Sequence, residues 1–294
     1  MASLMKSVTL KSPAKLNLFL RVLCRRADGY HDLVTVFHRL SLADTIKIKK
    51  APVYSLRCSN PALPTGGDNL ITKAWRLLKK RFPGLGPVRV YLKKTIPVGA
   101  GLGGGSSNAA AFLLGMKRLY GLRISKKELL ELGGKLGADV PFFIHNINQA
   151  IGIGVGDVIQ SKPAKTRQWF VLLISKRPLW TKEVYRKLSR PLPEVSLTKL
   201  SHAAILLCNF LDKKKLGPVA KLLQNDLESS AFLLRPSLQG IIRKVTKLGV
   251  PTVRMTGSGP TVFALVKSLR EANRLARNLR SGFPSLKIVV CHTQ

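Results

Sequence analysis

The sequence predicts an α+β fold built from two domains. The chain has 294 residues, room for about two domains of ordinary size, and 45% of them are hydrophobic, enough for real cores. Segments with strand-like alternation and segments with helical spacing follow one another in both halves, which is typical of α+β architecture. A stretch with proline and lysines at 160–168 is the best candidate boundary. We therefore expect domains at 1–162 and 163–294.

The first domain is expected to contain four strands and three helices. Strands are predicted at 15–23, 45–50, 53–58 and 88–94, and 53–58 is expected to pair with 45–50. Helices are predicted at 70–82, from Ser106 or Ser107 to Gly121, and at 125–137. Asp68 or Asn69 is a plausible N-cap of the first helix, and Ser125 and Glu128 have capping-box spacing at the third.

The second domain repeats the mixture of strands and helices. Strands are predicted at 169–175, 252–256, 261–266 and 286–292. Helices are predicted around 181–188, at about 196–211 and 216–248, and at 268–281.

Composition and pattern exclude several classes of protein. The longest apolar runs, such as 169–174 and 203–211, are too short to span a bilayer. The N-terminal stretch lacks the apolar core and cleavage site of a secretory signal. The four cysteines are scattered without a CxxC pair, so we expect no structural zinc and a cytoplasmic location.

The chain is strongly basic, with 50 Lys and Arg against 14 Asp and Glu and a formal net charge of +36. Such a charge indicates either a surface for nucleic acid or another polyanion, or simply solvated basic faces. The positive charge is spread along the whole chain, and the sequence has no zinc finger, aromatic-rich platform or RNA-binding signature. We therefore expect neither nucleic acid nor a membrane nor an obligatory protein as partner, although a secondary affinity for polyanions stays open.

The stretch GAGLGGGSSNAA at 99–110 is the densest glycine cluster. No lysine follows it as in a P-loop, and no HRD or DFG element follows as in protein kinases. Gly99, Gly101 and Gly104 satisfy GxGxxG, but the acidic residue of a dinucleotide site is missing. A strand, a glycine loop and a helix N-terminus still predict an anion site, with Ser106 and Ser107 as hydroxyl ligands of phosphate or Mg²⁺. The alternative is a flexible loop with serine as N-cap.

Asp139 is the best candidate for a catalytic acid or base. It lies in GADVPFFI, and a carboxylate among apolar residues must be paired or functional because burying an unpaired charge is costly. Lys15, in the apolar run PAKLNLFL, is its natural counter-charge. Such a pair could orient a hydroxyl that attacks phosphorus. The alternative is a helix-end cap or a structural ion pair.

A second glycine cluster, RMTGSGPTVFAL at 254–265, lies between two predicted strands. A tight hairpin would explain one or two of its glycines. Together with the first loop, it could instead close a triphosphate site from the C-terminal half.

Three motifs occur in order along nearly the whole chain: SPAKLNLFL at 12–20, IPVGAGLGGGSSNAA at 96–110 and MTGSGPTVFAL at 255–265. They resemble the motifs of the GHMP kinase superfamily, which includes galactokinase, homoserine kinase and mevalonate kinase. The resemblance implies an N-terminal domain like ribosomal protein S5, a C-terminal ferredoxin-like domain and an active site in the cleft between them. It also implies ATP and Mg²⁺ as cofactors.

Six shorter stretches narrow the resemblance. They are RRADGYHDL (25–33), LADTI (42–46), DNL (68–70), LGADVPFFI (136–144), GVGDVI (154–159) and QNDLE (224–228). They are similar to the 4-diphosphocytidyl-2-C-methyl-D-erythritol kinases of the non-mevalonate isoprenoid pathway. The ADGYH element decides this choice, because in that family its tyrosine and histidine hold the cytosine ring. Phosphorylation of the substrate's 2-hydroxyl by ATP is therefore implied.

The resemblance also implies roles for single residues. Asp139 would be the general base on the 2-hydroxyl, and Lys15 would position that base and stabilise the attacking oxygen. The expected substrate-binding residues are Asn17, Tyr30, His31, Lys94 and Tyr185. The expected ATP-binding residues are Asn69, Pro97, Gly99, Gly101, Leu102, Gly103, Gly104, Gly105, Ser106 and Ser107, the last two also near Mg²⁺. Thr256, Gly257, Ser258 and Gly259 form the C-terminal glycine turn.

Taken on composition alone, Tyr30 and His31 would be a core aromatic residue and a surface histidine. Cys24 stands where the family pattern has a small glycine, and the basic excess is not a trait of the family. Two alternatives therefore stay open: a GHMP kinase with another alcohol acceptor, and a basic nucleic-acid-binding protein on a kinase scaffold.

Overall fold

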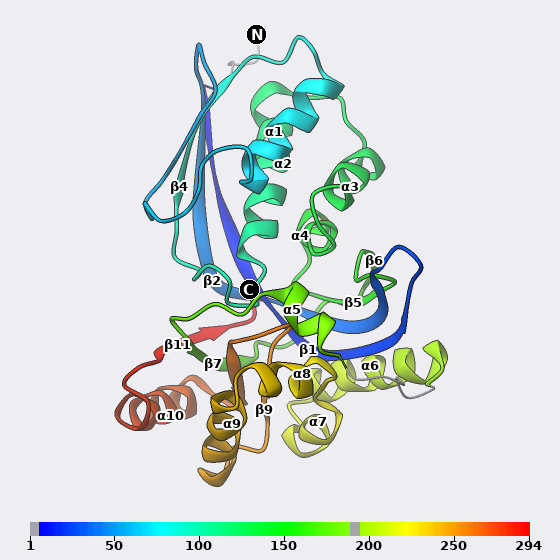
Figure 1. Ribbon diagram of the computed structural model, residues 1–294, viewed down its shortest axis with the longest axis vertical. Helices are drawn as coiled ribbons and strands as arrows, with labels where there is room; N and C mark the ends of the chain where they lie inside the picture. Colours follow the sequence, from blue (N-terminus) through cyan, green and yellow to red (C-terminus); the bar gives the residue numbers. More distant parts are fainter. Residues whose placement is uncertain (1–5, 189–194) are drawn as a thin grey trace. The chain divides into compact units, whose positions relative to one another are not determined.

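The computed structural model describes residues 6–188 and 195–294, which form two compact units from interleaved segments (Figure 1). Among the described residues, unit 1 comprises 6–14, 42–98 and 103–146, and unit 2 comprises 15–41, 99–102, 147–188 and 195–294. Two long strands, β1 (Ser7–Arg25) and β2 (His31–Lys50), contribute to both units. The units therefore do not follow a single cut of the chain, and the boundary at residue 162 stays a prediction. No helix among the described residues is long and apolar enough to cross a membrane.

Unit 1 is a sheet with helices on one face (Figure 1). Its remaining strands are β3 (Ser55–Cys58) and β4 (Val88–Lys93), and its helices are α1 (Leu70–Arg81), α2 (Gly104–Tyr120), α3 (Lys126–Gly134) and α4 (Val140–His145). Buried and exposed residues alternate strictly along β4, because successive side chains of a strand point to opposite faces. The buried side chains face α2. At Gly115 of α2 a Cβ would stand 2.6 Å from Ile48 Cδ1 and 2.9 Å from Leu10 Cδ1.

The prediction that 53–58 pairs with 45–50 is wrong. β4 lies between them, running antiparallel to β2 and parallel to β3. A parallel pair needs a long crossover, and here α1 supplies it between β3 and β4.

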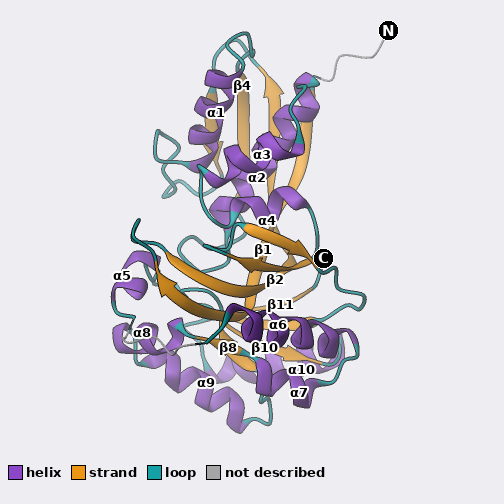
Figure 2. Cartoon of the chain, turned by 90° about the vertical axis from the view of Figure 1, so that its right-hand side faces the viewer, coloured by secondary structure: helices purple, strands orange, loops and turns teal. Residues whose placement is uncertain are grey.

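Unit 2 is organised around a four-stranded antiparallel sheet in the order β11-β7-β10-β9. These strands are β7 (Trp169–Ile174), β9 (Val253–Met255), β10 (Val262–Val266) and β11 (Lys287–His292). Helices α9 (Ser237–Lys247) and α10 (Leu269–Gly282) lie on one side of it (Figure 2). They bury Leu238, Val245, Leu275 and Leu279 in the core that covers the sheet.

The other elements of unit 2 bring distant segments of the chain together. β5 (Gln149–Ile153) pairs with β2 and with β6 (Val158–Ser161), and the two-residue β8 (Gln224–Asn225) pairs in parallel with β1. The remaining helices are α5 (Thr181–Arg186), α6 (Leu197–Asp212), α7 (Leu216–Leu222) and α8 (Leu227–Leu234).

The α+β prediction is confirmed, but one predicted helix is divided. Residues 216–248 form α7, β8, α8 and α9 instead of continuous helix. Pro236 takes the N-cap position of α9, where a proline is tolerated because it has no interior helical N–H to lose. The strands at 149–161, helix α4 and the first part of β2 were not predicted, because they are short or carry no clean alternation.

Candidate active site

The glycine loop ends in a helix N-terminus without a side-chain cap. α2 begins at Gly104, and its N-cap Gly103 has the left-handed φ of 66° that glycine permits. Ser106 and Ser107 therefore lie inside the first turn, and the predicted start of this helix at one of them is wrong. The unsatisfied amides of the first turn and the positive end of the helix dipole make this end suitable for an anion.

A buried polar network supports this turn from below. Asp44 of β2 accepts hydrogen bonds from Thr95 N at 2.6 Å, Ile96 N at 2.8 Å and Asn108 Nδ2 at 2.9 Å. It also forms an ion pair of 2.5 Å with Lys94 Nζ, and the Asp44 side chain is fully buried. Each carboxylate oxygen thus accepts two bonds, so the buried charge is satisfied.

The network continues into the first turn of α2. Asn108 Nδ2 also donates to Ser12 Oγ at 2.8 Å, and Ser12 Oγ donates to Ser107 Oγ at 2.9 Å. Ser107 is therefore buried and engaged with Ser12, whereas Ser106 remains partly exposed. Asp44, Ser12 and Asn108 were not singled out from the sequence. Each lies inside a quoted motif, Asp44 in LADTI, Ser12 in SPAKLNLFL and Asn108 in the glycine stretch, but none of the three was assigned a role.

Lys94 lies beside the N-terminus of α2 in unit 1. Its Nζ is 3.0 Å from the position that a Cβ of Gly104 would occupy, and the side chain is 6% exposed. A cation beside a helix N-terminus is unfavourable by itself, so the Asp44 carboxylate offsets its charge there. The predicted contact of Lys94 with the substrate stays a prediction.

Asn69 is the N-cap of α1, as the sequence allowed. Its Oδ1 accepts from Ile71 N at 2.9 Å, and its Nδ2 donates to Pro64 O at 2.8 Å. The side chain thus fixes both the start of the helix and the loop before it. Pro97 follows Ile96 at the beginning of the glycine loop, close in sequence to the amides that Asp44 binds.

The first half of the glycine loop packs in unit 2 against the C-terminal glycine turn. A Cβ on Gly101 would stand 2.6 Å from Gly259 O and 2.9 Å from Thr256 O, so no larger residue fits. Leu102 O accepts from Lys15 N at 3.0 Å, and Gly99 O accepts from Leu179 N at 3.4 Å. The predicted association of the two glycine clusters is therefore present in unit 2.

Side chains of the QNDLE motif fix the glycine turn. Asn225 Nδ2 donates to Met255 O at 2.9 Å and to Gly257 O at 2.8 Å. Glu228 accepts from Met255 N at 2.8 Å, and its burial raises the pKa of the carboxyl. The turn is thus held by polar side chains that lie about 30 residues earlier in the chain, and these residues received no role from the sequence.

Lys15 and Asn17 lie beside this turn. Lys15 is 4% exposed, its Nζ is 2.5 Å from Asn17 Oδ1, and it lies 5.6 Å from the centre of the Phe37 ring. Asn17 N donates to Thr256 Oγ1 at 2.8 Å, and a Cβ on Gly257 would stand 3.4 Å from Lys15 Nζ. Unit 2 therefore brings together a buried lysine, a buried amide and a glycine turn.

Two aromatic residues predicted to hold a base also meet in unit 2. The His31 and Tyr185 rings have centroids 5.0 Å apart and are tilted by 34°. Tyr30 is 63% exposed on the turn before β2, where its N–H donates to Asp28 Oδ1 at 3.0 Å. Ser258 of the glycine turn forms a hydrogen bond of 2.8 Å between its Oγ and Thr181 Oγ1, at the start of α5. Tyr185 lies one turn further along that helix.

Asp139 occupies the N-cap position of α4 in unit 1. Its side chain makes no capping hydrogen bond, and it is partly exposed although Val140, Pro141 and Phe142 are buried. The interpretation as a helix cap is therefore wrong. The segment before α4 packs against α2, because a Cβ added at Gly137 would lie 3.9 Å from Ser106 Oγ.

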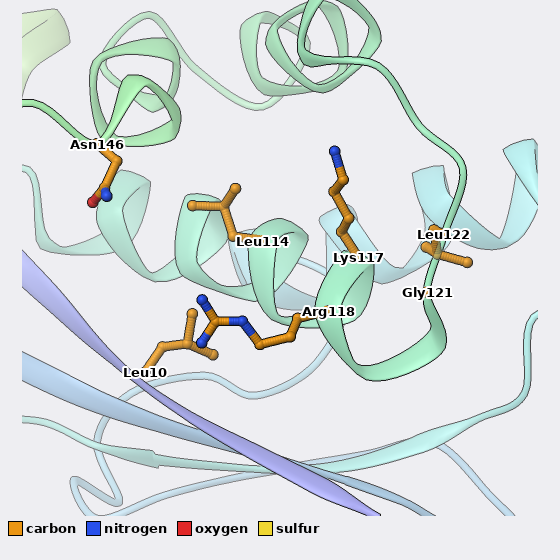
Figure 3. Close-up of a pocket in the computed structure, with 7 residues that line it drawn as sticks. All are labelled: Leu10, Leu114, Lys117, Arg118, Gly121, Leu122 and Asn146. Carbon is orange, nitrogen blue, oxygen red and sulfur yellow. The ribbon is translucent and has the colours of Figure 1, made fainter. Parts of the chain in front are cut away.

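A cavity of about 610 Å³ in unit 1 contains none of the predicted site residues. Leu10, Leu114, Lys117, Arg118, Gly121, Leu122 and Asn146 line it (Figure 3). The cavity lies at the C-terminal end of α2, whereas the glycine loop lies at the N-terminal end of that helix.

The described residues contain no group of three or more His, Cys, Asp or Glu side chains that could hold a metal ion. A cation that is brought by a nucleotide needs fewer protein ligands, since Mg²⁺ keeps several waters and phosphate oxygens. The partly exposed Ser106 hydroxyl fits that requirement better than the buried and engaged Ser107 hydroxyl.

Two family models match this chain. Residues 69–146 match the family described as GHMP kinases N terminal domain, and residues 206–285 match GHMP kinases C terminal. A 4-diphosphocytidyl-2-C-methyl-D-erythritol kinase of Pelobacter propionicus is 39% identical, over 93% of this chain and 94% of that protein. The kinase of the same name from Bacillus velezensis is 37% identical, over 93% and 92%.

Solved structures agree with these relatives. A crystal structure of 4-(cytidine 5'-diphospho)-2C-methyl-D-erythritol kinase superposes with a TM-score of 0.77 at 33% identity, covering 97% of this chain and 98% of the other. Mevalonate kinase of L. major, in complex with R-mevalonate, superposes with a TM-score of 0.72 at 16% identity, covering 100% and 99%. The second likeness is one of fold alone.

Proposed function

Since the chain belongs to the GHMP kinases, and within them to the 4-diphosphocytidyl-2-C-methyl-D-erythritol kinase family, we propose that it phosphorylates 4-diphosphocytidyl-2-C-methyl-D-erythritol. The γ-phosphoryl group of ATP passes to the 2-hydroxyl of this substrate, which gives the 2-phosphate and ADP. The observation that carries the proposal is the 33–39% identity to kinases of this name over nearly the whole length of both chains. The reaction belongs to isoprenoid precursor synthesis, and we place it in the cytoplasm.

In the proposed site, backbone groups of the glycine loop bind the ATP phosphates. Gly103 and Gly104 leave the first turn of α2 uncapped, and the Lys94–Asp44 ion pair lies beside it. Fixed donors of this kind stabilise the charge that develops on the transferring phosphoryl group. Asn69 and Pro97 border the loop and are assigned to the nucleotide, with Gly99, Gly101, Leu102, Gly105 and the two serines.

Mg²⁺ supplies charge neutralisation between the phosphates when it is bound with ATP. We assign Ser106 as the hydroxyl nearest to that ion, with Ser107 held behind it by Ser12.

Asp139 is proposed as the general base that takes the proton of the 2-hydroxyl. It stands partly exposed at the N-cap position of α4, beside the phosphate-binding end of α2 that is proposed above. Lys15 is proposed to orient the base and to stabilise the attacking oxygen, because a buried ammonium strengthens the charged form of a nearby alkoxide. Asn17 fixes Lys15 through their short hydrogen bond.

The cytosine is proposed to bind at Tyr30, His31 and Tyr185. The cytosine ring stacks on the face of a tyrosine ring, and the edge of the cytosine forms hydrogen bonds with the His31 imidazole. The tilted His31 and Tyr185 rings provide these two chemistries at one place in unit 2.

The test is phosphorylation, by Mg-ATP, of the cytidylyl substrate in parallel with a panel of small alcohols that includes mevalonate and homoserine. We expect turnover of the cytidylyl substrate alone. Tyr30→Ala should raise KM for it at least tenfold, whereas Tyr30→Phe should stay near the wild type. Turnover of another alcohol with equal efficiency would contradict the acceptor, and an unchanged KM in Tyr30→Ala would contradict the cytosine pocket.

A further inference from the structure

The open face of the unit 1 sheet carries a concentration of positive charge that the kinase reaction does not use. In unit 1, helices cover only one face of the sheet formed by β3, β4 and the unit 1 parts of β1 and β2 (Figure 1). Along residues 7–11, 45–50, 55–58 and 88–93, the residues that point to the other face are exposed or half-buried and alternate with more buried ones. The cations among them are Lys11, Lys47, Lys49, Arg57, Arg89 and Lys93. We call this surface the basic sheet face.

In the unit 1 parts of these strands, residues 7–14, 42–50, 55–58 and 88–93, Asp44 is the one carboxylate. It points inward to Lys94 and to the backbone amides before the glycine loop. Asp32, the other carboxylate of β2, lies in unit 2. Within the described part of the chain, none of the six cations forms an ion pair. Lys11 Nζ donates to the neighbouring Thr45 Oγ1 at 3.2 Å, which places β1 and β2 side by side on this face. The charge is therefore available to an external anion.

The register of the strands shows that this arrangement costs stability. Lys49 stands directly opposite Arg89 across the antiparallel β2–β4 pair. Like charges at directly opposed positions of a sheet destabilise it, and a purely structural surface would place opposite charges or neutral residues there. An unfavourable pairing of this kind is explained if an anionic partner neutralises it.

An aromatic side chain lies in the middle of the cations. Tyr91 of β4 is 46% exposed, and it stands opposite Lys47 on β2 and opposite Arg57 on β3. A flat platform that combines an exposed ring with flanking cations can stack one base and bind the phosphates on either side of it.

We propose that the basic sheet face binds single-stranded nucleic acid, with the phosphates held by its lysines and arginines and a base stacked on Tyr91. This second activity is independent of the phosphoryl transfer, because no residue of the basic sheet face belongs to the proposed active site. The sequence predicted no nucleic-acid partner but left a secondary affinity for polyanions open, and the basic sheet face gives such an affinity a location.

A second basic surface of the same chain provides a matched control. Arg270, Arg274, Arg277 and Arg280 are exposed on α10 of unit 2, and no tyrosine or tryptophan stands among them. Replacing these four by glutamine removes the same net charge as Lys47→Gln, Lys49→Gln, Arg89→Gln and Lys93→Gln. The two quadruple variants therefore separate a local site from the effect of the overall charge.

Binding of fluorescently labelled oligouridylate 20-mers is measured by anisotropy over a salt series, for the wild type and both quadruple variants. We expect the sheet variant to bind at least tenfold more weakly and to flatten the slope of log K against log salt by about 2–3, as expected for about four lost phosphate contacts. The α10 variant should stay within threefold of the wild type. Equal weakening by both variants would overturn the proposal, since the overall charge would then explain the binding.

The stacking part has its own test. Tyr91→Ala should weaken binding about fivefold or more, and Tyr91→Phe should restore it, because base stacking on an aromatic ring needs the ring and not the hydroxyl. A single-stranded DNA, a duplex of equal length and phosphatidylserine vesicles are compared in the same buffer. Preference for either single strand supports the proposal. Equal binding of the duplex or of the vesicles, with no effect of Tyr91→Ala, would overturn it.

Kinase turnover and the melting temperature are recorded for every variant. Turnover should stay within twofold of the wild type throughout. The melting temperature of the sheet variant should not fall, since its substitutions relieve the opposition of like charges.

Discussion

At the scale of single residues, Asp139 is the side chain on which the proposed chemistry depends most. Asp139→Asn keeps the shape of the residue and removes its capacity to accept a proton. We expect kcat to fall by about two orders of magnitude or more, the usual range for loss of an acid–base group, with KM for ATP within a few-fold. Steady-state kinetics with both substrates measures this. Near-normal turnover would refute the assignment of the base.

His38 makes the stability of unit 2 depend on pH. Its ring is fully buried, with Nε2 at 3.0 Å from Thr293 Oγ1, and burial lowers its pKa to about 3. The unfolded chain binds a proton near pH 6.5, while the native state stays neutral, so stability is lost as the pH falls from 6.5 towards 3. The slope is about 1.4 kcal/mol per pH unit.

Urea unfolding at pH 6.5 and pH 5 tests this effect. The wild type should lose about 2 kcal/mol more than His38→Gln, in which no group titrates at this position. If both proteins lose the same free energy of unfolding between these pH values, His38 does not cause the dependence.

Residues inside a recognisable motif could be singled out from the sequence, whereas residues whose partners lie far along the chain could not. Lys15, Asn17 and the glycines were singled out because they stand inside such motifs, and their roles stay predictions. Asp44 was missed because its partners Lys94 and Asn108 are 50 and 64 residues away. An isolated aspartate in a strand gives no sign that four donors will converge on it.

At the scale of elements, the buried Asp44 connects β2, the end of β4 and α2. Asp44→Asn would present an amide to the buried Lys94 ammonium and leave that charge without a counter-ion. We expect a loss of about 3–5 kcal/mol of unfolding free energy, as for other broken buried pairs. Urea denaturation measures the loss.

A double variant separates the effect of the unpaired charge from the effect of altered packing. Asp44→Asn combined with Lys94→Met removes both charges, and we expect it to recover more than half of the loss. A single Asp44→Asn variant within 1 kcal/mol of the wild type would show that the ion pair contributes little.

Most helices and strands with strong periodicity were predicted within a few residues. The predicted 70–82, 196–211 and 268–281 correspond to α1, α6 and α10. Pairing was harder to predict, because the position of β4 between β2 and β3 depends on a crossover and not on the strands themselves. The two-residue β8 has no local signal, since its pairing with β1 alone defines it.

At the scale of the whole molecule, the net charge of +36 opposes the compact state. Salt shortens the Debye length from about 30 Å at 0.01 M to about 10 Å at 0.1 M and so screens this repulsion. We expect the melting temperature to rise with sodium chloride over this range, measured by differential scanning fluorimetry without nucleotide. The variant that lacks the four α10 arginines should show a smaller rise. A melting temperature that falls with salt would show that attractive charge pairs dominate.

The interleaving of the two units affects how the protein forms during synthesis. Unit 1 has its last residue at 146, whereas unit 2 joins residues 15–41 to residues after 147. The hydrogen bond from Asn17 N to Thr256 Oγ1 cannot form until Thr256 has been synthesised, 239 residues later. At ordinary translation rates this interval is roughly 10–50 s. During that time the apolar second half of β1 has left the ribosome without the segments that bury it, so this half is the part of the nascent chain most in need of a chaperone.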